Sequence, residues 1–203
     1  MLRVATIPVG PLEVNCYVAW DEATGQALVV DPGDDPAEVV AEVRRLKLVP
    51  RGILLTHGHV DHIRGVGPVA AGFAIPVYIS AADRRLYESP HNALLPWLAA
   101  AEGLPQSQDA PVLLTGLGPA VISTPGHTPG SVCFHFAGAG VLFSGDTLFA
   151  GSVGRTDLPG GDSEALLSSI RSRLLVLPPG TSVLPGHGPP TTIGEETRTN
   201  PFL

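Results

Sequence analysis

The sequence predicts a single α/β domain over residues 1–203, and three observations support this. The length fits one domain that buries a sizeable hydrophobic core. Short segments rich in Val, Ile and Leu recur between Gly and Pro residues, which is typical of strands. Segments with apolar residues at helical spacing separate some of them. No repeat of fixed period and no change of composition marks a domain boundary, so we expect no separate C-terminal substrate domain.

The N-terminal quarter is predicted to form three strands and one helix. The strands are residues 4–7, 16–20 and 27–30, each bounded by turn or charged residues. After them, Asp34 and Asp35 can cap a helix that has Pro36 in its first turn. The apolar stripe of this helix is formed by Ala37, Val39, Val40, Val43 and Leu46.

The middle of the chain is predicted to add two strands, residues 53–55 and 77–79. Between them we expect a helix from about Asp61 to about Ala71, which Gly65 and Gly67 weaken. Several prolines interrupt residues 87–111, so we expect a long, partly helical loop there, with an apolar patch at residues 94–98.

The C-terminal half is predicted to contain four strands and one helix. The strands are residues 120–123, 132–136, 141–143 and 182–184. The helix follows Asp162, and its apolar stripe is formed by Ala165, Leu166, Leu167, Ile170 and Leu174. The two cysteines, Cys16 and Cys133, are too few for a disulfide framework, and we expect both to be small buried residues within strands.

The charge pattern excludes several classes of partner. The formal net charge is −7, and the longest basic clusters are the pairs Arg44-Arg45 and Arg84-Arg85. Because binding to phosphates needs a basic stripe, we expect no nucleic-acid partner. Pro8, Gly10, Pro11 and Glu13 interrupt the N-terminal apolar residues, so we expect neither a signal peptide nor a membrane span. The expected location is the cytoplasm, and the pattern does not indicate an oligomeric state.

Potential metal ligands follow four of the predicted strands. They are His57, His59, Asp61 and His62, then His127, Asp146 and His187. Loops at the carboxyl ends of strands converge in sheet proteins, so we expect these side chains to meet. Imidazole and carboxylate suit Zn²⁺, and also iron or manganese. Seven donors exceed what one tetrahedral ion uses, whereas two ions bridged by a carboxylate fit the number. The remaining histidines, His91 and His135, are interpreted as structural.

The motifs around these residues resemble those of the metallo-β-lactamase superfamily. They are THGHVDH, TPGHTPGS, FSGDTLF and PGHGPPT, in this order along the chain. GSVGRTDLPGGD and the final GHGPPTTIGEETRTNPFL are similar to the short, single-domain glyoxalase II-like hydrolases. The resemblance implies a four-layer αβ/βα sandwich, in which two mixed sheets face each other and helices lie outside. The strand pattern alone leaves a doubly wound sheet open.

The resemblance also implies a role for each ligand. His57, His59 and His127 would hold the first metal, Asp61, His62 and His187 the second, and Asp146 would bridge them. The cofactor would be two divalent ions, with zinc expected and iron or manganese as alternatives. Asp61 would in addition orient the nucleophile and manage its proton. Asp31 would support the histidine loop from behind the ligands; the alternative is an aspartate that only forms the turn before Pro32.

The function implied is that of a binuclear metallohydrolase, which cleaves a thioester such as a hydroxyacylglutathione by attack of a metal-bridging hydroxide. We expect a small acidic substrate, whose carboxylate Arg155 would bind. The alternative for Arg155 is a loop salt bridge to Asp157 or Asp162. Longer glyoxalase II enzymes hold glutathione with a basic C-terminal domain. Since residues 188–203 contain one basic residue, Arg198, glutathione recognition here must be different, weaker or absent.

Four other functions compete with this one. The first is an iron-dependent glutathione persulfide dioxygenase of the same superfamily, but that branch tends to follow its last histidine with Asp-Tyr, whereas Gly188-Pro189 follows here. A phosphodiesterase or nuclease is disfavoured by the acidic balance. A non-enzymatic metal-binding module would have a degraded ligand set. Hydrolysis of β-lactams is disfavoured by the missing secretory signal. Covalent catalysis is also disfavoured, because the chain has no GxSxG motif.

Overall fold

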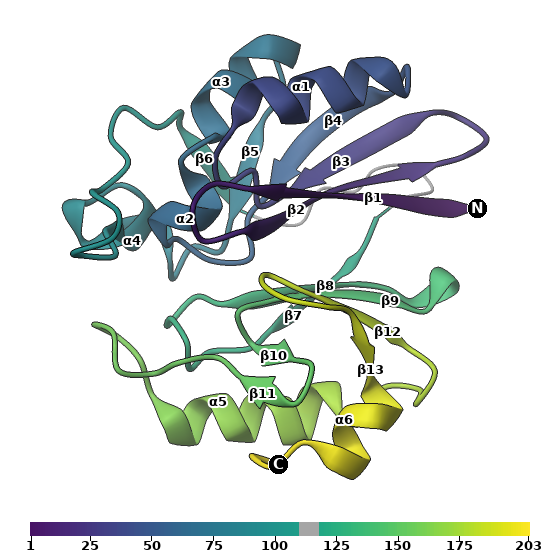
Figure 1. The fold of residues 1–203 in the computed structure, drawn as a ribbon, viewed down its shortest axis with the longest axis vertical. Helices are drawn as coiled ribbons and strands as arrows, with labels where there is room; N and C mark the ends of the chain where they lie inside the picture. The colour runs from purple at the N-terminus through teal and green to yellow at the C-terminus, as the bar shows by residue number, and fades with distance from the viewer. Residues whose placement is uncertain (110–117) are drawn as a thin grey trace.

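Two β-sheets lie face to face, and helices cover the outer face of each (Figure 1). The computed structural model describes residues 1–109 and 118–203. The strand order is β1-β2-β3-β4-β5-β6 in the first sheet and β13-β12-β9-β8-β7 in the second. Both sheets combine parallel and antiparallel pairs. The four-layer αβ/βα sandwich is thereby confirmed, and the doubly wound alternative is excluded.

The first sheet and its helices come from the N-terminal half. Its strands are β1 (Leu2–Val9), β2 (Val14–Asp21), β3 (Gln26–Val30), β4 (Val49–Leu54), β5 (Val77–Ile79) and β6 (Ser107–Asp109). Its helices are α1 (Pro36–Arg45), α2 (Val60–Ile63), α3 (Val66–Phe73) and α4 (Arg84–Tyr87), and a 3-10 turn follows at Pro90–Asn92. The five predicted strands are present. The edge strand β6 was missed because its sequence, Ser-Gln-Asp, is entirely polar.

The second sheet and its helices come from the C-terminal half. Its strands are β7 (Ala120–Ser123), β8 (Val132–Phe136), β9 (Val141–Gly145), β12 (Ser182–Pro185) and β13 (Thr191–Thr192), beside the small hairpin β10 (Leu148–Phe149) and β11 (Ser152–Val153). Helix α5 (Ser163–Ser169) continues as a π-helical turn (Ile170–Leu174), and α6 (Ile193–Thr199) follows β13. A 3-10 turn at Ala137–Ala139 joins β8 to β9. The helix predicted after Asp162 is present as α5, and Asp162 caps it, because its carboxylate accepts a hydrogen bond from the Ala165 backbone N–H at 2.9 Å.

Two helix predictions need correction. The helix expected from about Asp61 to about Ala71 is two helices, because the Gly65 backbone N–H leaves the helical ladder and donates to the Pro32 carbonyl at 2.9 Å. A Cβ at Gly65 would lie 2.7 Å from that same oxygen, so the break requires glycine. Asp35 stands at the start of α1 but does not cap it with its side chain, which instead accepts from the Gly10 N–H at 2.8 Å.

The loop predicted for residues 87–111 is partly helical, with the 3-10 turn at Pro90–Asn92 and the strand β6 within it. Its last two residues, 110 and 111, lie outside the described residues. His91 is exposed in this loop, and His135 is buried within β8. Both cysteines are buried in strands, as expected, and neither forms a disulfide.

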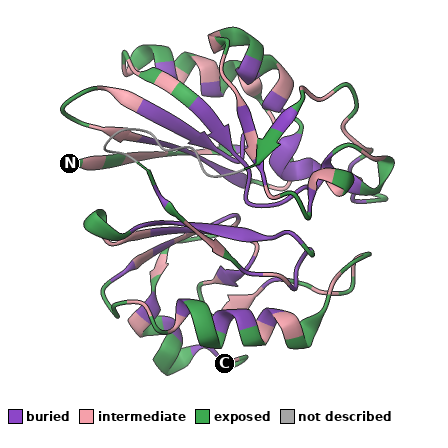
Figure 2. Ribbon diagram, turned by 180° about the vertical axis from the view of Figure 1, so that it is seen from behind, coloured by how far each residue is buried: buried purple, intermediate pink, exposed green. Residues whose placement is uncertain are grey.

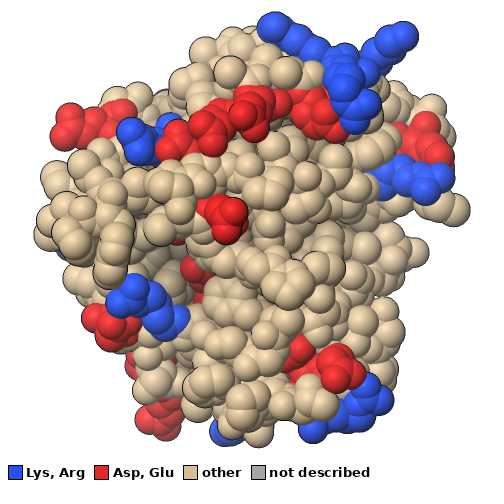
Figure 3. Space-filling model, viewed as in Figure 1, with Lys and Arg blue, Asp and Glu red and all other residues tan. Residues whose placement is uncertain are grey.

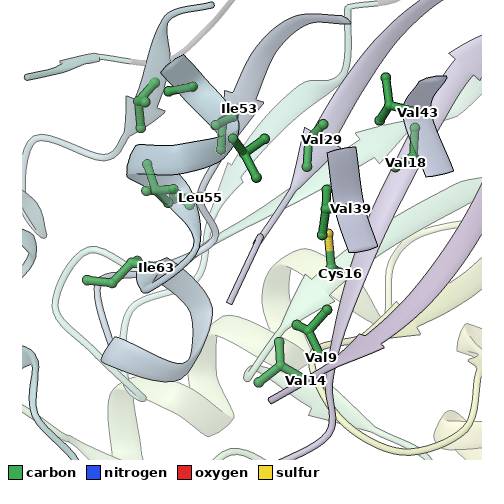
Figure 4. Close-up of a cluster of buried hydrophobic side chains, with 14 of the residues drawn as sticks. Val9, Val14, Cys16, Val18, Val29, Val39, Val43, Ile53, Leu55 and Ile63 are labelled. Carbon is green, nitrogen blue, oxygen red and sulfur yellow. The ribbon is translucent and has the colours of Figure 1, made fainter. Parts of the chain in front are cut away.

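Three apolar clusters hold the layers together. One fills the space between the first sheet and α1 and α3, and Figure 4 shows Cys16 there among Val9, Val14 and Val39. A second lies between the sheets and contains Tyr17, Leu28 and Phe143, among others. A third packs α5 against the second sheet. The central strands are therefore buried on both faces (Figure 2), which explains their continuous apolar sequences. No helix within the described parts is long and apolar enough to cross a membrane.

Candidate metal centre

All seven predicted ligands meet at one edge of the sandwich, where loops from both sheets converge. Asp61 and His62 lie on α2, and the others lie in or beside the loops after β4, β7, β9 and β12. Their donor atoms form three groups, within each of which all atoms lie within 4.8 Å of one another. The first group is His57, His59 and His127, the second group is Asp61, His62 and His187, and the third, His57, His62 and Asp146, overlaps both. His91 and His135 belong to none of them.

The first group consists of three imidazoles. His59 Nδ1 lies 2.9 Å from His127 Nε2. Burial lowers the pKa of His59 to about 4 and holds that of His57 well below its usual value. His127 Nδ1 lies 2.8 Å from the Arg155 carbonyl oxygen, to which it donates as Nδ1–H, so its Nε2 lone pair faces the group. Neutral imidazoles with converging lone pairs are the donors that a divalent transition metal prefers.

The second group adds carboxylates. His187 Nε2 lies 3.3 Å from Asp61 Oδ2, and His62 Nε2 lies 3.9 Å from the same oxygen. Burial opposes charge on His62, but the carboxylates of Asp146 and Asp61 outweigh it and raise the pKa of His62 well above its usual value. The same balance raises the pKa of His187. This half of the site is therefore more polar and attracts positive charge.

Asp146 lies between the two groups. Its Oδ1 is 3.3 Å from His62 Nε2, and its Oδ2 is 3.8 Å from His127 Nε2 and 3.7 Å from His187 Nε2. Burial favours the neutral carboxyl, but the surrounding histidines outweigh it and hold the pKa of Asp146 well below its usual range. A Cβ at Gly186 would lie 2.3 Å from Asp146 Oδ1, so the close approach of this loop requires glycine.

Asp31 orients part of the cluster from behind. Its carboxylate accepts from the Thr56 N–H at 2.8 Å and from the Thr56 hydroxyl at 2.6 Å, and it lies 3.0 Å from His62 Nδ1. Thr56 Oγ1 in turn lies 3.0 Å from His57 Nδ1 and accepts from it, since the hydroxyl proton points to Asp31. Both histidines are thereby held with Nε2 toward the cluster. These contacts go beyond those of an aspartate that only forms a turn.

Unsatisfied buried atoms test whether this cluster fits a metal. Within the described ranges, seven buried side-chain polar atoms have no hydrogen-bond partner, and four of them belong to the cluster. These four are His57 Nε2, Asp61 Oδ1, His62 Nε2 and Asp146 Oδ1. Orphaned buried polar atoms are costly unless they bind something. Because all four are metal-ligand atoms in the arrangement described above, the cluster fits a binuclear metal site.

A cleft of about 380 Å³ opens onto the cluster and is lined on one side by its ligands. Its other walls are mainly apolar. Leu12, Leu94, Phe149, Val153 and Leu158 form them, together with Ser152 and Arg155. The sequence does not identify these walls. Leu94 belongs to the apolar patch predicted in the long loop, but nothing in the sequence places that patch beside the ligands.

Arg155 lines the same cleft and is paired with Asp157. Its Nε and Nη2 donate to the two carboxylate oxygens at 2.7 Å and 2.8 Å. The guanidinium also lies 6.0 Å from the ring centre of Trp97. The salt bridge considered for Arg155 is therefore present, with Asp157 rather than Asp162. The pairing leaves the guanidinium at the cleft, where it can still contact a substrate.

The family model of the metallo-beta-lactamase superfamily matches residues 9–187, a range that includes every ligand described above. The chain belongs to this superfamily. Among its relatives, hydroxyacylglutathione hydrolase GloC of Haemophilus influenzae is 37% identical to this chain, and the alignment covers all of this chain and 98% of GloC. The probable metallo-hydrolase YqgX of Bacillus subtilis is 39% identical to this chain, and the alignment covers 97% of this chain and 95% of YqgX.

Three solved structures also match. BLEG-1, a B3 metallo-beta-lactamase, has a TM-score of 0.89 at 40% identity and covers 99% of each chain. TTHA1623, solved in a di-iron-bound form, has a TM-score of 0.88 at 42% identity, and the match covers 98% of this chain and all of the TTHA1623 chain. ETHE1 from Myxococcus xanthus has a TM-score of 0.79 at 27% identity over 98% of this chain and 83% of its own. Superfamily membership, the metallo-hydrolase relatives and the His/Asp cluster together support an enzyme with a binuclear metal site.

Proposed function

We propose that this protein is a binuclear metallohydrolase that cleaves a thioester such as a hydroxyacylglutathione. The observation that carries the proposal is the complete set of donor groups beside one cleft, which His59, Asp61, His127, Asp146 and His187 line directly. Similarity over the whole chain to a relative named hydroxyacylglutathione hydrolase supports the choice of substrate class. A thioester also suits the site, because a thiolate is a good leaving group and needs little protonation.

The proposed ligand assignment follows the donor groups. His57, His59 and His127 hold the first ion, and Asp61, His62 and His187 hold the second. Asp146, which lies between the groups, bridges the two ions. Zinc is the proposed metal, with iron or manganese as alternatives, since nitrogen and oxygen donors accept all three.

The residues of the cleft are proposed to have different roles toward the substrate. When bound, two divalent ions supply a water that loses its proton near neutral pH, and they polarise a substrate carbonyl. Asp61 lines the cleft and has one carboxylate oxygen without a partner, so it is placed to orient that water and to take its proton. The apolar walls, which include Phe149 and Leu158, hold the acyl group and exclude water.

Arg155 is proposed to contact the carboxylate of a small acidic substrate at the cleft mouth. The surface charges agree with a small ligand rather than a nucleic acid or a membrane. On the face shown in Figure 3, Lys and Arg side chains stand beside Asp and Glu side chains instead of forming a basic stripe.

A glutathione persulfide dioxygenase is the second candidate, because the same nitrogen and oxygen donors would also hold iron. The iron in the TTHA1623 structure shows that a relative of this length holds that metal. A third activity to assay is hydrolysis of β-lactams, since BLEG-1 is 40% identical.

The deciding experiment compares zinc-loaded and iron-loaded protein in the same assays. We expect hydrolysis of lactoylglutathione at the same rate under nitrogen and under air, and full support by zinc, because zinc has no redox chemistry. Oxygen uptake with glutathione persulfide that needs iron, without thioester cleavage under either metal, would transfer the assignment to the dioxygenase. Turnover of a chromogenic β-lactam faster than that of the thioester would transfer it to a lactamase.

A further inference from the structure

Asp83 is a fully buried carboxylate that belongs to none of the ligand groups. It lies after β5 and directly before α4. Its Oδ2 accepts from the Gly58 backbone N–H at 3.0 Å and from the Thr128 hydroxyl at 2.7 Å. Its Oδ1 accepts from the Gly130 backbone N–H at 2.7 Å. One side chain therefore joins three segments that are distant in sequence.

The contacted residues are immediate neighbours of the first-group histidines. Gly58 lies between His57 and His59, and Thr128 follows His127. Asp83 thus ties the loop after β4, from the first sheet, to the loop after β7, from the second. The distance of 2.9 Å between His59 Nδ1 and His127 Nε2 depends on how these two loops are held relative to each other.

Two features of the loop after β7 favour its contact with Asp83. A Cβ at Gly130 would lie 2.4 Å from the Asp83 backbone N and 2.6 Å from Asp83 Oδ1, so a larger residue would separate the two segments. Thr128 is fixed on its other side by Ser131, whose Oγ lies 2.7 Å from the Thr128 hydroxyl oxygen. The Thr128 hydroxyl is therefore already oriented toward the Asp83 carboxylate.

We propose that Asp83 is a positioning residue for the first metal site, which holds the His57–His59 loop and the His127 loop at the spacing that one ion requires. Asp31 has a different role, because it contacts His62 of the second group directly, supports His57 only through Thr56, and makes no hydrogen bond to the His127 loop. Loss of Asp83 therefore weakens the first site and leaves the second intact. The proposal rests on the ligand assignment given under Proposed function.

Asparagine is a sharp probe of this role because it keeps the size of aspartate. An amide offers one acceptor oxygen and one NH₂ group, whereas the two backbone donors, Gly58 N–H and Gly130 N–H, face different oxygens of Asp83. In either orientation of the amide, one backbone N–H then faces an NH₂ group. Asp83→Asn thus releases one of the two loops without opening a cavity.

The test measures zinc affinity in two single-site backgrounds, by competition with a chromogenic chelator. His187→Ala removes a second-group donor and isolates the first site, and His59→Ala does the reverse. We expect Asp83→Asn to weaken zinc binding about 10-fold or more in the His187→Ala background, in line with other residues that support metal ligands. In the His59→Ala background, we expect the affinity to stay within about twofold, since the second site retains its Asp31 support.

Thr128→Val gives a second, milder variant that keeps the side-chain volume and removes one of the three contacts. It should weaken the first site by less than Asp83→Asn does. The matched control is Asn92→Ala, because Asn92 is also fully buried and makes three hydrogen bonds, to Tyr87 and Ala101 and to neither ligand loop. It should lower the melting temperature without changing the zinc affinity of either background.

Equal losses in both backgrounds would show that Asp83 only stabilises the fold, and an unchanged first site would show that it has no role in the spacing; either result overturns the proposal. Failure of the unmodified protein to bind two zinc ions would overturn the metal assignment itself. That outcome is distinguishable, because it is visible before Asp83 is changed.

Discussion

At the scale of single residues, the site depends on which ring nitrogen each histidine turns toward the cleft. His57, His62, His127 and His187 all have Nδ1 beside an oxygen that lies outside the cluster. Two of these oxygens are backbone carbonyls, of Arg155 and of Leu12. Each such contact fixes the ring and directs Nε2 inward, so the donor set is arranged before any ion binds.

The first prediction concerns Asp146, which faces both groups. Asp146→Ala should reduce the affinity for both ions by more than about 100-fold, since a direct ligand contributes more than the supporting residues for which 10- to 100-fold losses are typical. Turnover should be lost with the metal. Metal content after dialysis, measured by mass spectrometry, checks this. Glu22→Ala removes an exposed carboxylate that pairs with Arg3 and should keep both ions; full occupancy in Asp146→Ala would contradict the bridging role.

The second prediction separates substrate contact from salt bridge at Arg155. Arg155→Ala should retain both ions and raise KM for an acidic thioester about 10-fold, with a smaller change in kcat, because a charge-assisted contact to the bound substrate is lost. Asp157→Ala is the matched control, since it breaks the same ion pair and leaves the guanidinium in place. If the two variants changed KM equally, or not at all, the pair would be only structural.

The residues that meet beside the cleft are identifiable from the sequence at this scale, because they stand in short motifs such as His57-Gly58-His59. The contacts that orient these residues are not predictable. The oxygens that hold His127 and His187 belong to residues 28 and 175 positions away, and nothing in their sequence marks them. Asp83 was missed for the same reason, since a single aspartate among polar residues carries no signal of its three partners.

At the scale of elements, strands were easier to predict than helices. The central strands of both sheets are apolar along their length because both of their faces are buried. Helix α6 is short and mostly polar, and it was missed although Thr192 and Glu195 have the spacing of a capping box, in which the Thr192 hydroxyl accepts from the Glu195 N–H at 3.1 Å. The break between α2 and α3 depends on a contact of Gly65 with Pro32, which local sequence cannot show.

The third prediction tests how closely the His127 loop packs on α5. Gly126 has φ +142°, and a Cβ there would lie 2.3 Å from both the N and the Cα of Leu166 in the helix. Gly126→Ala should therefore cost about 3 kcal/mol or more of unfolding free energy, because neither backbone can move freely. Chemical denaturation measures the cost. Gly138→Ala, whose Cβ would meet no other atom within 4 Å, should be nearly neutral; similar losses in both would contradict the packing argument.

At the scale of the whole molecule, the metal centre joins the two halves of the sandwich. Four donors come from the first half, namely His57, His59, Asp61 and His62, and three from the second, namely His127, Asp146 and His187. Hydrogen bonds between the two halves also lie close to this site. One of them runs from the Tyr17 hydroxyl to the Pro185 carbonyl at 2.7 Å. How two sheets face each other cannot be deduced from strand patterns, which is why the sandwich was expected from family resemblance and not from periodicity.

The last prediction follows from this arrangement. Without ions, Asp61 and Asp146 are buried carboxylates with unpaired oxygens at the junction of the two halves, so metal binding should stabilise the folded state strongly. Two sites at a thousandfold excess over Kd would each contribute about 4 kcal/mol. Since each kcal/mol shifts Tm by about 2–4 °C in a chain of this size, chelation should lower Tm by at least about 10 °C.

Scanning calorimetry of chelated and reloaded protein checks this, with the shift saturating at two zinc ions per chain. Asp146→Ala should show little of this dependence under the same treatment. An unchanged Tm after complete removal of metal, or saturation at one ion, would contradict a binuclear centre that links the two sheets.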